Sequence, residues 1–404
     1  MKRAGTIAGV LILLLGALLL SPAALAQQEI RIGAIYPRSG SLALLGEESW
    51  RGAEIARQER NEAGGILGRQ IVFVNADAPN VNAARSEAER LISQQGVQLL
   101  IGTYSSALSM AASEAAARRG VTFFELGAIS DGITQRGYKT VFRTNPTASM
   151  FVAAQMAFLR DWMAPQMGKE PEQLRVAIAH EDSDYGTSVA ENMRREAERL
   201  GLNLVSVQPY SSTSTDLSSV ILRLRAASPD VIVAVSYAQD AILLQRQAHE
   251  LGLRSKVVGT GGGHSLSSFY EALGDLAEGV FNVDFTQYEV NTAFTPGLEE
   301  FRERYRATFG EEPRSGHSLA NYMGAHVLFD IIERSGGSLD PERIRASTLS
   351  YVVRPGQLAT GWGVRFDETG QNVGATPLVT QWRGGKLVTV WPEQAAVMAP
   401  VLIE

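Results

Sequence analysis

Short apolar segments alternate with helical segments along most of this 404-residue chain, and this alternation constrains the fold more than any other feature. Strands are expected at 29–36, 70–75, 99–101 and 121–124, with helices at 47–63, 81–95 and 107–119 between and after them. Glycines end these helices, at Gly64-Gly65, Gly96 and Gly120. Because the strands are short and apolar, the pattern predicts a parallel sheet with helices on both faces.

The alternation is interrupted at Asn145-Pro146, because a residue before proline is displaced from helical geometry. It then restarts, with strands expected at 175–180, 203–208, 231–235 and 256–259, and helices at 148–163, 187–200, 217–227 and 239–251. The chain is therefore predicted to be an α/β protein with two doubly wound units in series.

The last third of the chain has a different pattern. Helices are expected at 296–309, 318–334 and 341–349, followed by short antiparallel strands at 363–366, 377–382 and 387–391. Gly384-Gly385 is suited to the hairpin turn between the last two strands.

The N-terminus predicts export. Lys2 and Arg3 precede an apolar run at 7–20, and Ala24-Leu25-Ala26 provides a cleavage site before Gln27. An uncleaved membrane anchor is the alternative, but the run of about 14 residues is shorter than the ~20 that a spanning helix needs. Residues 1–26 are therefore interpreted as a signal peptide, and the mature protein is expected in the periplasm.

Composition narrows the class of protein further. The chain has no cysteine, so it lacks both disulfides and a lipid-attachment site and should be free in its compartment. Its formal charge is −6 and it has no basic stripe, which argues against nucleic acid. Five histidines with no His-Glu-x-x-His pair, and no phosphate-loop or dinucleotide motif, predict no metal and no cofactor.

Several motifs in a fixed order resemble the leucine/isoleucine/valine-binding protein family, which comprises type I periplasmic receptors of ABC transporters. Each motif is weak alone, but together they extend over nearly the whole mature chain. They are Pro37-Arg38-Ser39-Gly40 with Gly46, Gly52-Ala53, Gly64-Gly65-Ile66-Leu67-Gly68-Arg69, Ile101-Gly102 with Ser105-Ser106, Thr134-Gln135-Arg136-Gly137-Tyr138, Phe142-Arg143-Thr144, Tyr185-Gly186, Tyr237, and Phe366-Asp367 with Gly370.

The resemblance implies two lobes joined by a three-strand hinge, with a small-molecule ligand in the cleft between them. Crossings are expected near Asn145, Phe285 and Thr360. The N-terminal lobe would contain 27–145 and 286–359, and the other lobe 146–285 and 360–404. The family resemblance further implies a monomer that delivers an amino acid or a related small carboxylate compound to ABC permease subunits in the membrane.

The resemblance also implies ligand contacts on the first lobe. Leu45 lies where the family has an aromatic or apolar contact. Ser106 lies at the start of a helix, where the family uses a hydroxyl and backbone N–H groups to hold the ligand's α-carboxylate. Tyr104 and Ser105 are adjacent, and Gly127 offers a backbone group. The alternative for the two serines is an ordinary helix cap.

On the second lobe, Tyr185 and Tyr237 would cover the ligand when the lobes close, and His264 lies in a cleft loop. The alternative for the two tyrosines is a core position with a bonded hydroxyl. Tyr322, from the last third of the chain, could form an apolar wall.

Two departures from the family pattern affect the ligand. Ile129 stands where the family usually has a ligand-binding threonine, and Gly261 where it usually has an acid that pairs with the ligand's ammonium group. The ligand is therefore expected not to be a plain branched-chain amino acid, unless another acid substitutes. Glu125 is the first candidate for that acid and Asp284 the second; alternatively, Glu125 is satisfied by local N–H groups.

Two other classes of function remain as alternatives. The same clamp could report to a membrane signalling protein instead of a permease. A serine hydrolase is the weaker alternative, since Gly263-His264-Ser265-Leu266-Ser267 and Gly316-His317-Ser318-Leu319-Ala320 both lack the final glycine of a nucleophile elbow. Asp284 and His326 would have to complete its triad.

Overall fold

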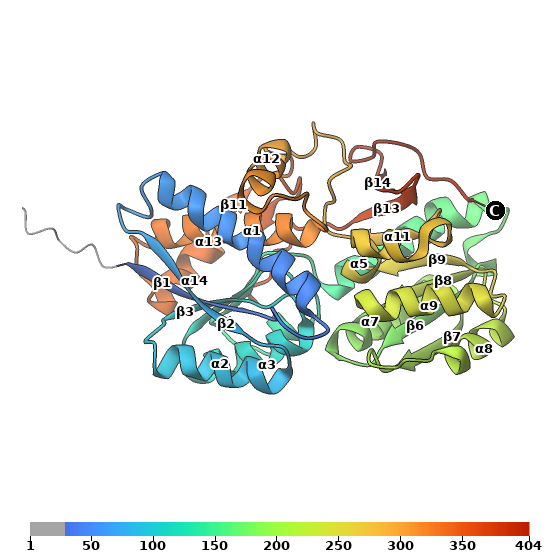
Figure 1. Ribbon diagram of the computed structural model, residues 1–404, viewed down its shortest axis with the longest axis horizontal. Helices are drawn as coiled ribbons and strands as arrows, with labels where there is room; N and C mark the ends of the chain where they lie inside the picture. The colour runs from blue at the N-terminus through green and yellow to red at the C-terminus, as the bar shows by residue number, and fades with distance from the viewer. Residues whose placement is uncertain (1–28, 404) are drawn as a thin grey trace, which may run out of the picture.

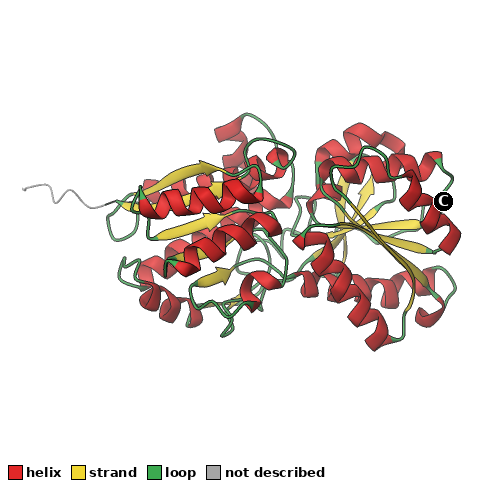
Figure 2. Cartoon of the chain, turned by 90° about the horizontal axis from the view of Figure 1, so that it is seen from below, coloured by secondary structure: helices red, strands yellow, loops and turns green. Residues whose placement is uncertain are grey.

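Two separate sheets organise the structure, a computed structural model that describes residues 29–403. Each sheet lies between helices in its own lobe, and the two lobes lie side by side along the long axis of the molecule (Figures 1 and 2). The predicted signal peptide and its cleavage site lie outside the described residues. None of the helices in 29–403 is long and apolar enough to cross a membrane.

The first sheet has the strand order β2-β1-β3-β4-β5, and all its strands are parallel. The strands are β1 (Ile30–Tyr36), β2 (Ile71–Asp77), β3 (Leu99–Gly102), β4 (Thr122–Glu125) and β5 (Val141–Arg143). Successive side chains enter the apolar cores on opposite faces, as Phe123 and Phe124 do. A sheet buried on both faces needs strands that are apolar throughout, which is the pattern the sequence has.

Helices cover both faces of the first sheet. They are α1 (Ala43–Glu62), α2 (Val81–Ser93), α3 (Ser106–Arg118), α4 (Gly132–Gln135), α13 (Gly316–Arg334) and α14 (Pro341–Leu349), whereas α12 (Leu298–Phe309) packs on α1 and α13. Residues of α1 and α13 belong to the core on one face, and residues of α2 and α3 to the core on the other. The crossing of α1 and α13 requires Gly52, because a Cβ there would lie 1.9 Å from the carbonyl oxygen of Ser318.

The second sheet has the order β14-β13-β10-β9-β8-β6-β7. Its strands are β6 (Arg175–Glu181), β7 (Asn203–Tyr210), β8 (Val231–Val235), β9 (Lys256–Thr260), β10 (Phe281–Asp284), β13 (Leu378–Arg383) and β14 (Lys386–Trp391). The first five are parallel, and β13 and β14 extend the edge in antiparallel fashion through the predicted Gly384-Gly385 turn.

The helices of the second lobe are α5 (Ala148–Phe158), which continues through a π-helical turn at Leu159–Met163 and α6 (Ala164–Gln166), then α7 (Asp184–Leu200), α8 (Ser218–Ala227), α9 (Ala238–Glu250), α10 (Gly262–Ser265) and α11 (Ser267–Leu273). Short 3₁₀ turns lie at Pro171–Gln173 and Gly274–Ala277. Residues of α5 and α7 belong to the core on one face of the sheet, and residues of α8 and α9 to the core on the other.

The chain passes between the lobes after β5, after β10 and before β13. The first two passages are hydrogen-bonded to the segment that precedes the third. The Gln371 amide donates to the Asn145 carbonyl (2.9 Å), and the Thr286 hydroxyl donates to the Thr360 carbonyl (2.5 Å).

The third passage differs from the expectation near Thr360. Strand β12 (Val364–Arg365) pairs with β11 (Val352–Val353), and Gln371 forms a bridge with Arg143 at the edge of the first sheet. The passage therefore lies between Asn372 and Leu378. The sequence pattern missed this because pairing partners in a two-stranded hairpin are selected by tertiary contacts.

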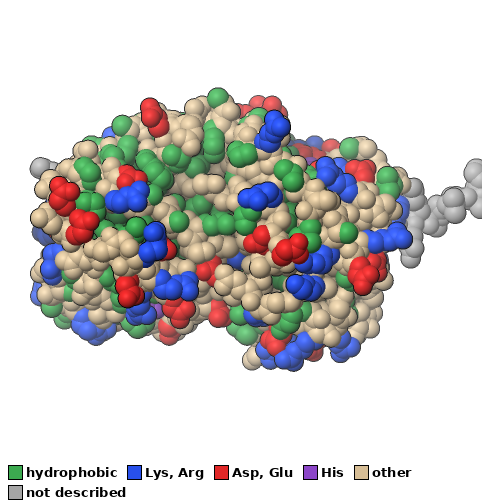
Figure 3. Space-filling model, turned by 180° about the vertical axis from the view of Figure 1, so that it is seen from behind, with side chains coloured by type: hydrophobic (Ala, Val, Ile, Leu, Met, Phe, Trp, Pro, Cys, Tyr) green, Lys and Arg blue, Asp and Glu red, His purple; other side chains and the backbone are tan. Residues whose placement is uncertain are grey.

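The surface in Figure 3 has Lys and Arg side chains intermingled with Asp and Glu, without a large area of one sign. This distribution is typical of a solvated surface of mixed charge.

Candidate functional site

The carboxyl ends of both sheets face one cavity between the lobes. Ligands of open α/β sheets bind at this edge, because the loops and helix N-termini there leave polar groups free. Most predicted site residues line the cavity, namely Leu45, Tyr104, Ser106, Gly127, Ile129, Tyr185, Tyr237, Gly261 and Asp284. Residues that the sequence interpretation did not assign to the site complete the lining: Phe151, Ser236, Gly262, Phe285 and His317.

Ser106 is the first residue of α3 and lines the cavity. Its hydroxyl accepts a hydrogen bond from the backbone N–H of Ser130 (3.1 Å), so its own hydrogen is available for a ligand. The N-terminus of α3 adds partial positive charge at the same place. This end of the cavity has donors that suit an anionic group, so the role predicted for Ser106 stays a prediction.

Glu125 does not line the cavity, which corrects its choice as the first substitute acid. Its buried carboxylate accepts backbone N–H bonds from Thr103 (2.9 Å), Gly127 (2.8 Å) and Ala128 (2.7 Å), and a bond from the Ser109 hydroxyl. Burial raises its pKa, and these hydrogen bonds partly oppose the rise. Glu125 therefore holds the β3 and β4 loops in place from beneath the cavity, which is the alternative that the sequence had left open.

Arg143 completes this buried scaffold from β5. Its guanidinium is fully buried and donates to the carbonyls of Ala128 (3.2 Å) and Ser130 (2.7 Å), and to the Gln371 side chain (2.6 Å). Burial lowers its pKa to about 10, so it stays charged near neutral pH. Glu125 and Arg143 together shape the loop that presents Gly127 and Ile129 to the cavity.

Aromatic side chains from the second lobe close over the cavity. The Tyr185 and Tyr237 rings lie 5.2 Å apart, and the Tyr237 ring meets that of Tyr104 on the first lobe edge-to-face at 6.4 Å. Ser105 does not line the cavity; its hydroxyl lies 3.2 Å from that of Tyr237, across the cleft. The Tyr185 hydroxyl donates to the carbonyl of Thr260.

The lobes are closed against each other at further points. Asn192 on α7 donates to the carboxylate of Asp131 on the first lobe (2.7 Å), and the Asp131 N–H donates to the Ser188 hydroxyl (3.1 Å). A Cβ on Gly262 would lie 2.6 Å from a methyl group of Leu45. A side chain at Gly262 would therefore force Leu45 to shift in the closed form.

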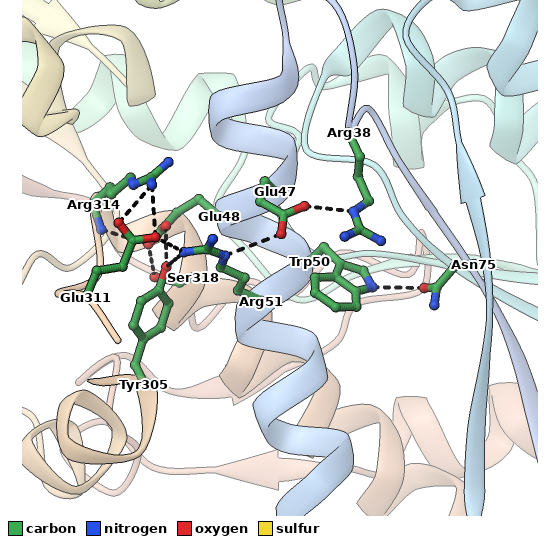
Figure 4. Close-up of polar contacts among 10 residues, drawn as sticks. All are labelled: Arg38, Glu47, Glu48, Trp50, Arg51, Asn75, Tyr305, Glu311, Arg314 and Ser318. Carbon is green, nitrogen blue, oxygen red and sulfur yellow. Dashed lines mark hydrogen bonds and ion pairs between the residues drawn. The ribbon is translucent and has the colours of Figure 1, made fainter. Parts of the chain in front are cut away.

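A polar network on the first lobe fixes two elements of the cavity wall (Figure 4). The buried Glu48 carboxylate on α1 accepts from the hydroxyls of Tyr305 (2.7 Å) and Ser318 (2.6 Å), and from the backbone N–H of Arg314 (2.9 Å). Burial raises the pKa of Glu48, and these bonds partly offset the rise. The network holds α1, which carries Leu45, against the start of α13, which carries His317.

His264 and Tyr322 lie away from the cavity lining, contrary to their inclusion in the site. His264 is buried against Phe269, with its carbonyl accepting from the Trp382 indole (2.8 Å). Tyr322 projects from α13 toward α1, where its hydroxyl donates to Glu59 (2.7 Å). Helical spacing alone does not show which face of α13 meets the cleft.

Phe285 and Ser236 directly follow β10 and β8, so the rule that ligands bind beyond strand ends could have predicted them. The short strand β10 was not among the expected strands. His317 and Phe151 come from helices, and no local sequence signal distinguishes their inward positions.

The triad expected for a serine hydrolase is not assembled, because its histidine is engaged elsewhere. The Ser265 hydroxyl contacts that of Ser315 (3.1 Å), whereas His326 pairs with Glu59 (3.2 Å) in the packing of α13 on α1. Within residues 29–403, no cluster of three or more His, Asp and Glu side chains is arranged to hold a metal ion.

Comparisons with known proteins agree with this geometry. A family model described as "Periplasmic binding protein" matches residues 29–386. The Leu/Ile/Val-binding protein homolog 8 of Brucella abortus is 45% identical over 371 residues, which cover 91% of this chain and 92% of that protein.

Two solved structures have the same arrangement of lobes. The leucine binding protein LivK of Thermotoga maritima superimposes with a TM-score of 0.78 at 25% identity, covering 90% of this chain and 98% of its own. A solute binding protein of R. palustris in complex with benzoate has a TM-score of 0.77 at 19% identity, covering 93% and 99%.

Proposed function

This chain belongs to the periplasmic binding protein family, and on that premise we propose that it is the extracytoplasmic solute-binding protein of an ABC transporter, with an amino acid or a related small carboxylate compound as its cargo. The family resemblance and the two-lobed type I fold that the motifs implied are confirmed. The observation that carries the proposal is the cavity enclosed between the lobes, lined by hydroxyls and aromatic rings from both.

Ligand binding begins, in this proposal, on the first lobe. A carboxylate docks at the start of α3, where the Ser106 hydroxyl and helix N–H groups donate to it. Closure then brings Tyr185 and Tyr237 over the ligand. Only the closed form presents both lobes to a permease in one orientation, so the ligand acts through its greater affinity for that form.

Export through the signal peptide at 1–26 and a periplasmic location complete the proposal, together with a monomeric state. The family's name supports the location, and the absence of cysteine excludes lipid attachment through a cysteine. The relatives do not fix the cargo, because the same fold is present in a leucine binding protein and in a protein that binds benzoate.

A thermal-shift screen of L-amino acids, aliphatic amides, keto acids and aromatic acids tests the proposal. A ligand at a hundred times its Kd adds about 2.7 kcal/mol to the free energy of unfolding, which raises Tm measurably. Small-angle X-ray scattering of the ligand-free protein and of the best hit then tests closure. A screen without any stabilising compound, or identical scattering with and without the hit, would contradict the proposal.

A further inference from the structure

His317 brings a polar ring into the cavity among aromatic and aliphatic side chains. It is the second residue of α13, and its ring lies edge-to-face with Tyr104 (5.7 Å between centroids) and 4.9 Å from the centroid of Phe285. Leu45 lies beside it, since a Cβ on Gly262 would be 2.8 Å from the imidazole Cε1 and 2.6 Å from a Leu45 methyl group. Such surroundings disfavour the charged ends of a ligand, so His317 faces an uncharged side chain.

The imidazole of His317 is neutral, and one of its two nitrogens is unused by the protein. Only 5% of the residue is exposed, and burial lowers its pKa to about 3. Nδ1 lies 3.2 Å from the Ser315 hydroxyl, whereas Nε2 has no hydrogen-bond partner in the described part of the chain. A neutral imidazole has one nitrogen that donates and one that accepts. What Nε2 offers to a ligand therefore depends on whether Nδ1 carries the hydrogen of the ring.

A chain of hydroxyl groups decides where that hydrogen lies. The Ser265 hydroxyl is 3.1 Å from that of Ser315 and 3.4 Å from the carbonyl oxygen of Gly262. Burial raises the pKa of Asp284 to about 7, and a hydrogen bond from Ser265 opposes the rise. The carbonyl and the ionised carboxylate can only accept, so the single hydrogen of Ser265 goes to one of them. Ser265 is then the acceptor in its contact with Ser315.

The hydrogen of Ser315 is thereby committed to Ser265, and this fixes the tautomer of His317. Ser315 can only accept from the ring, so Nδ1 carries the hydrogen and Nε2 has a free lone pair. The Ser315 oxygen has room for this bond, since it otherwise accepts only a long bond from the backbone N–H of His317 (3.4 Å). Ser265 belongs to the second lobe and Ser315 to the first, so closure completes the chain. The closed cavity therefore presents an acceptor at His317.

We propose that His317 determines specificity by accepting a hydrogen bond at Nε2 from an N–H or O–H group on the side chain of the cargo. A buried acceptor without a donor destabilises the closed form; a side chain with a donor removes this cost, and an aliphatic side chain does not. The cargo is thus an amino acid, or a related carboxylate compound, with a hydroxyl or amide in its side chain. This inference rests on the proposed function and narrows its ligand range.

Isothermal titration at pH 8 with two pairs of isosteric amino acids tests the inference. L-threonine has a hydroxyl in place of one methyl group of L-valine, and L-asparagine has an amide in place of the two methyl groups of L-leucine. In the wild type, the polar member of at least one pair should bind at least about tenfold more tightly than its isostere. A smaller preference in both pairs, or binding of none of the four amino acids, would overturn the inference.

His317→Phe keeps an aromatic ring and removes the acceptor. It should reduce the preference within the favoured pair to less than about threefold, a ratio that a purely structural role of His317 would not change. His326→Phe is the matched control, because His326 lies on the same helix but pairs with Glu59 outside the cavity, and it should keep the preference of the wild type. A preference that survives His317→Phe, or that falls equally in both variants, would overturn the inference.

The tautomer of His317 provides a second test, which uses the wild-type protein. In nitrogen NMR spectra of protein with 15N-labelled histidine, saturated at pH 8 with the polar member of the favoured pair, the His317 ring should carry its hydrogen on Nδ1. A hydrogen on Nε2 would overturn the inference. A thermal-shift screen without any hit counts instead against the proposed function, so the two failures are distinguishable.

Discussion

The hydroxyl of Tyr237 on the second lobe lies 3.2 Å from the hydroxyl of Ser105 on the first, directly across the cleft. Ser105 precedes α3, and Tyr237 precedes α9, so the contact joins the ends of two helices that start at the cavity. It is formed only when the lobes are closed. The contact therefore reports on closure, and its removal should affect the closed form alone.

Tyr237→Phe tests that relationship. Loss of one hydrogen bond of about 0.5–1.5 kcal/mol should raise the Kd of the best ligand by roughly two- to tenfold, measured by isothermal titration. The Tm of the ligand-free protein should change little if its lobes are open in solution. Tyr270→Phe, outside the cavity, is the control and should leave the Kd unchanged; an equal effect of both variants would contradict the role of Tyr237 in closure.

Glu125→Gln should lower the free energy of unfolding. Glutamine keeps one acceptor oxygen, but its NH2 group cannot accept, so either the backbone N–H bond from Thr103 or the bonds from Gly127 and Ala128 must be lost. Loss of bonds to a buried charged group should lower the free energy of unfolding by about 2–4 kcal/mol, measured by urea denaturation. The exposed Glu303→Gln should stay within about 0.5 kcal/mol of the wild type. A Glu125→Gln protein of unchanged stability would refute the structural role of Glu125.

Gly262→Ala should hold the lobes apart. The new methyl group would lie 2.6 Å from Leu45 and 2.8 Å from His317, both on the opposite lobe. Ligand-saturated Gly262→Ala should keep a larger radius of gyration than the saturated wild type in X-ray scattering, with at least tenfold weaker binding. Leu45→Ala added to Gly262→Ala removes one of the two obstructions and should restore part of the closure. Normal compaction of the single variant would argue against this closed geometry.

Asp284 lines the cavity and stays the candidate acid for an ammonium group, so binding of an amine ligand should strengthen as pH rises through 7. The pKa of Asp284 is raised to about 7, so its ionised fraction grows on the order of tenfold between pH 6 and pH 8. The Kd of the best amine ligand should fall by a similar factor over this interval, and Asp284→Asn should remove the dependence. His317 should not contribute, because its pKa of about 3 leaves it neutral throughout.

The same ionisation should have the opposite effect on the ligand-free protein. Between the ordinary pKa of an aspartate and about 7, the folded state binds more protons than the unfolded state at Asp284, so the free energy of unfolding should decrease as pH rises across that window. Comparison of urea unfolding curves at pH 5 and pH 8, with Asp284→Asn as reference, measures this contribution. A wild-type difference no larger than that of the variant would contradict it.

The strand-helix alternation was sufficient to predict most elements, because each long helix and each apolar strand has a periodic pattern of its own. It missed β5, which has only three residues, and β10, in which Asn282 and Asp284 interrupt the apolar run; neighbouring strands stabilise both. It also placed the last passage too early, because β11 and β12 pair through tertiary contacts.

In the candidate site too, some residues could be predicted from the local sequence pattern and others depend on tertiary packing. Residues that follow strand ends, such as Ser106 and Tyr237, could be predicted, since the carboxyl edge of a parallel sheet determines where they lie. His317 could not be predicted in this way, since it reaches the cavity only through the packing of α13 on α1 around Glu48.

By itself, the sequence determined the two doubly wound lobes, the absence of disulfides and the edge of each sheet that faces the cavity, because these follow from local periodicity and composition. Only the tertiary structure decided between the two acids. Glu125 and Asp284 both end strands in the sequence, but the carboxylate of one is surrounded by backbone N–H groups while that of the other lines the cavity with no cation beside it. The partners of a buried charge come from segments distant in the chain, so they are defined only when the chain is folded.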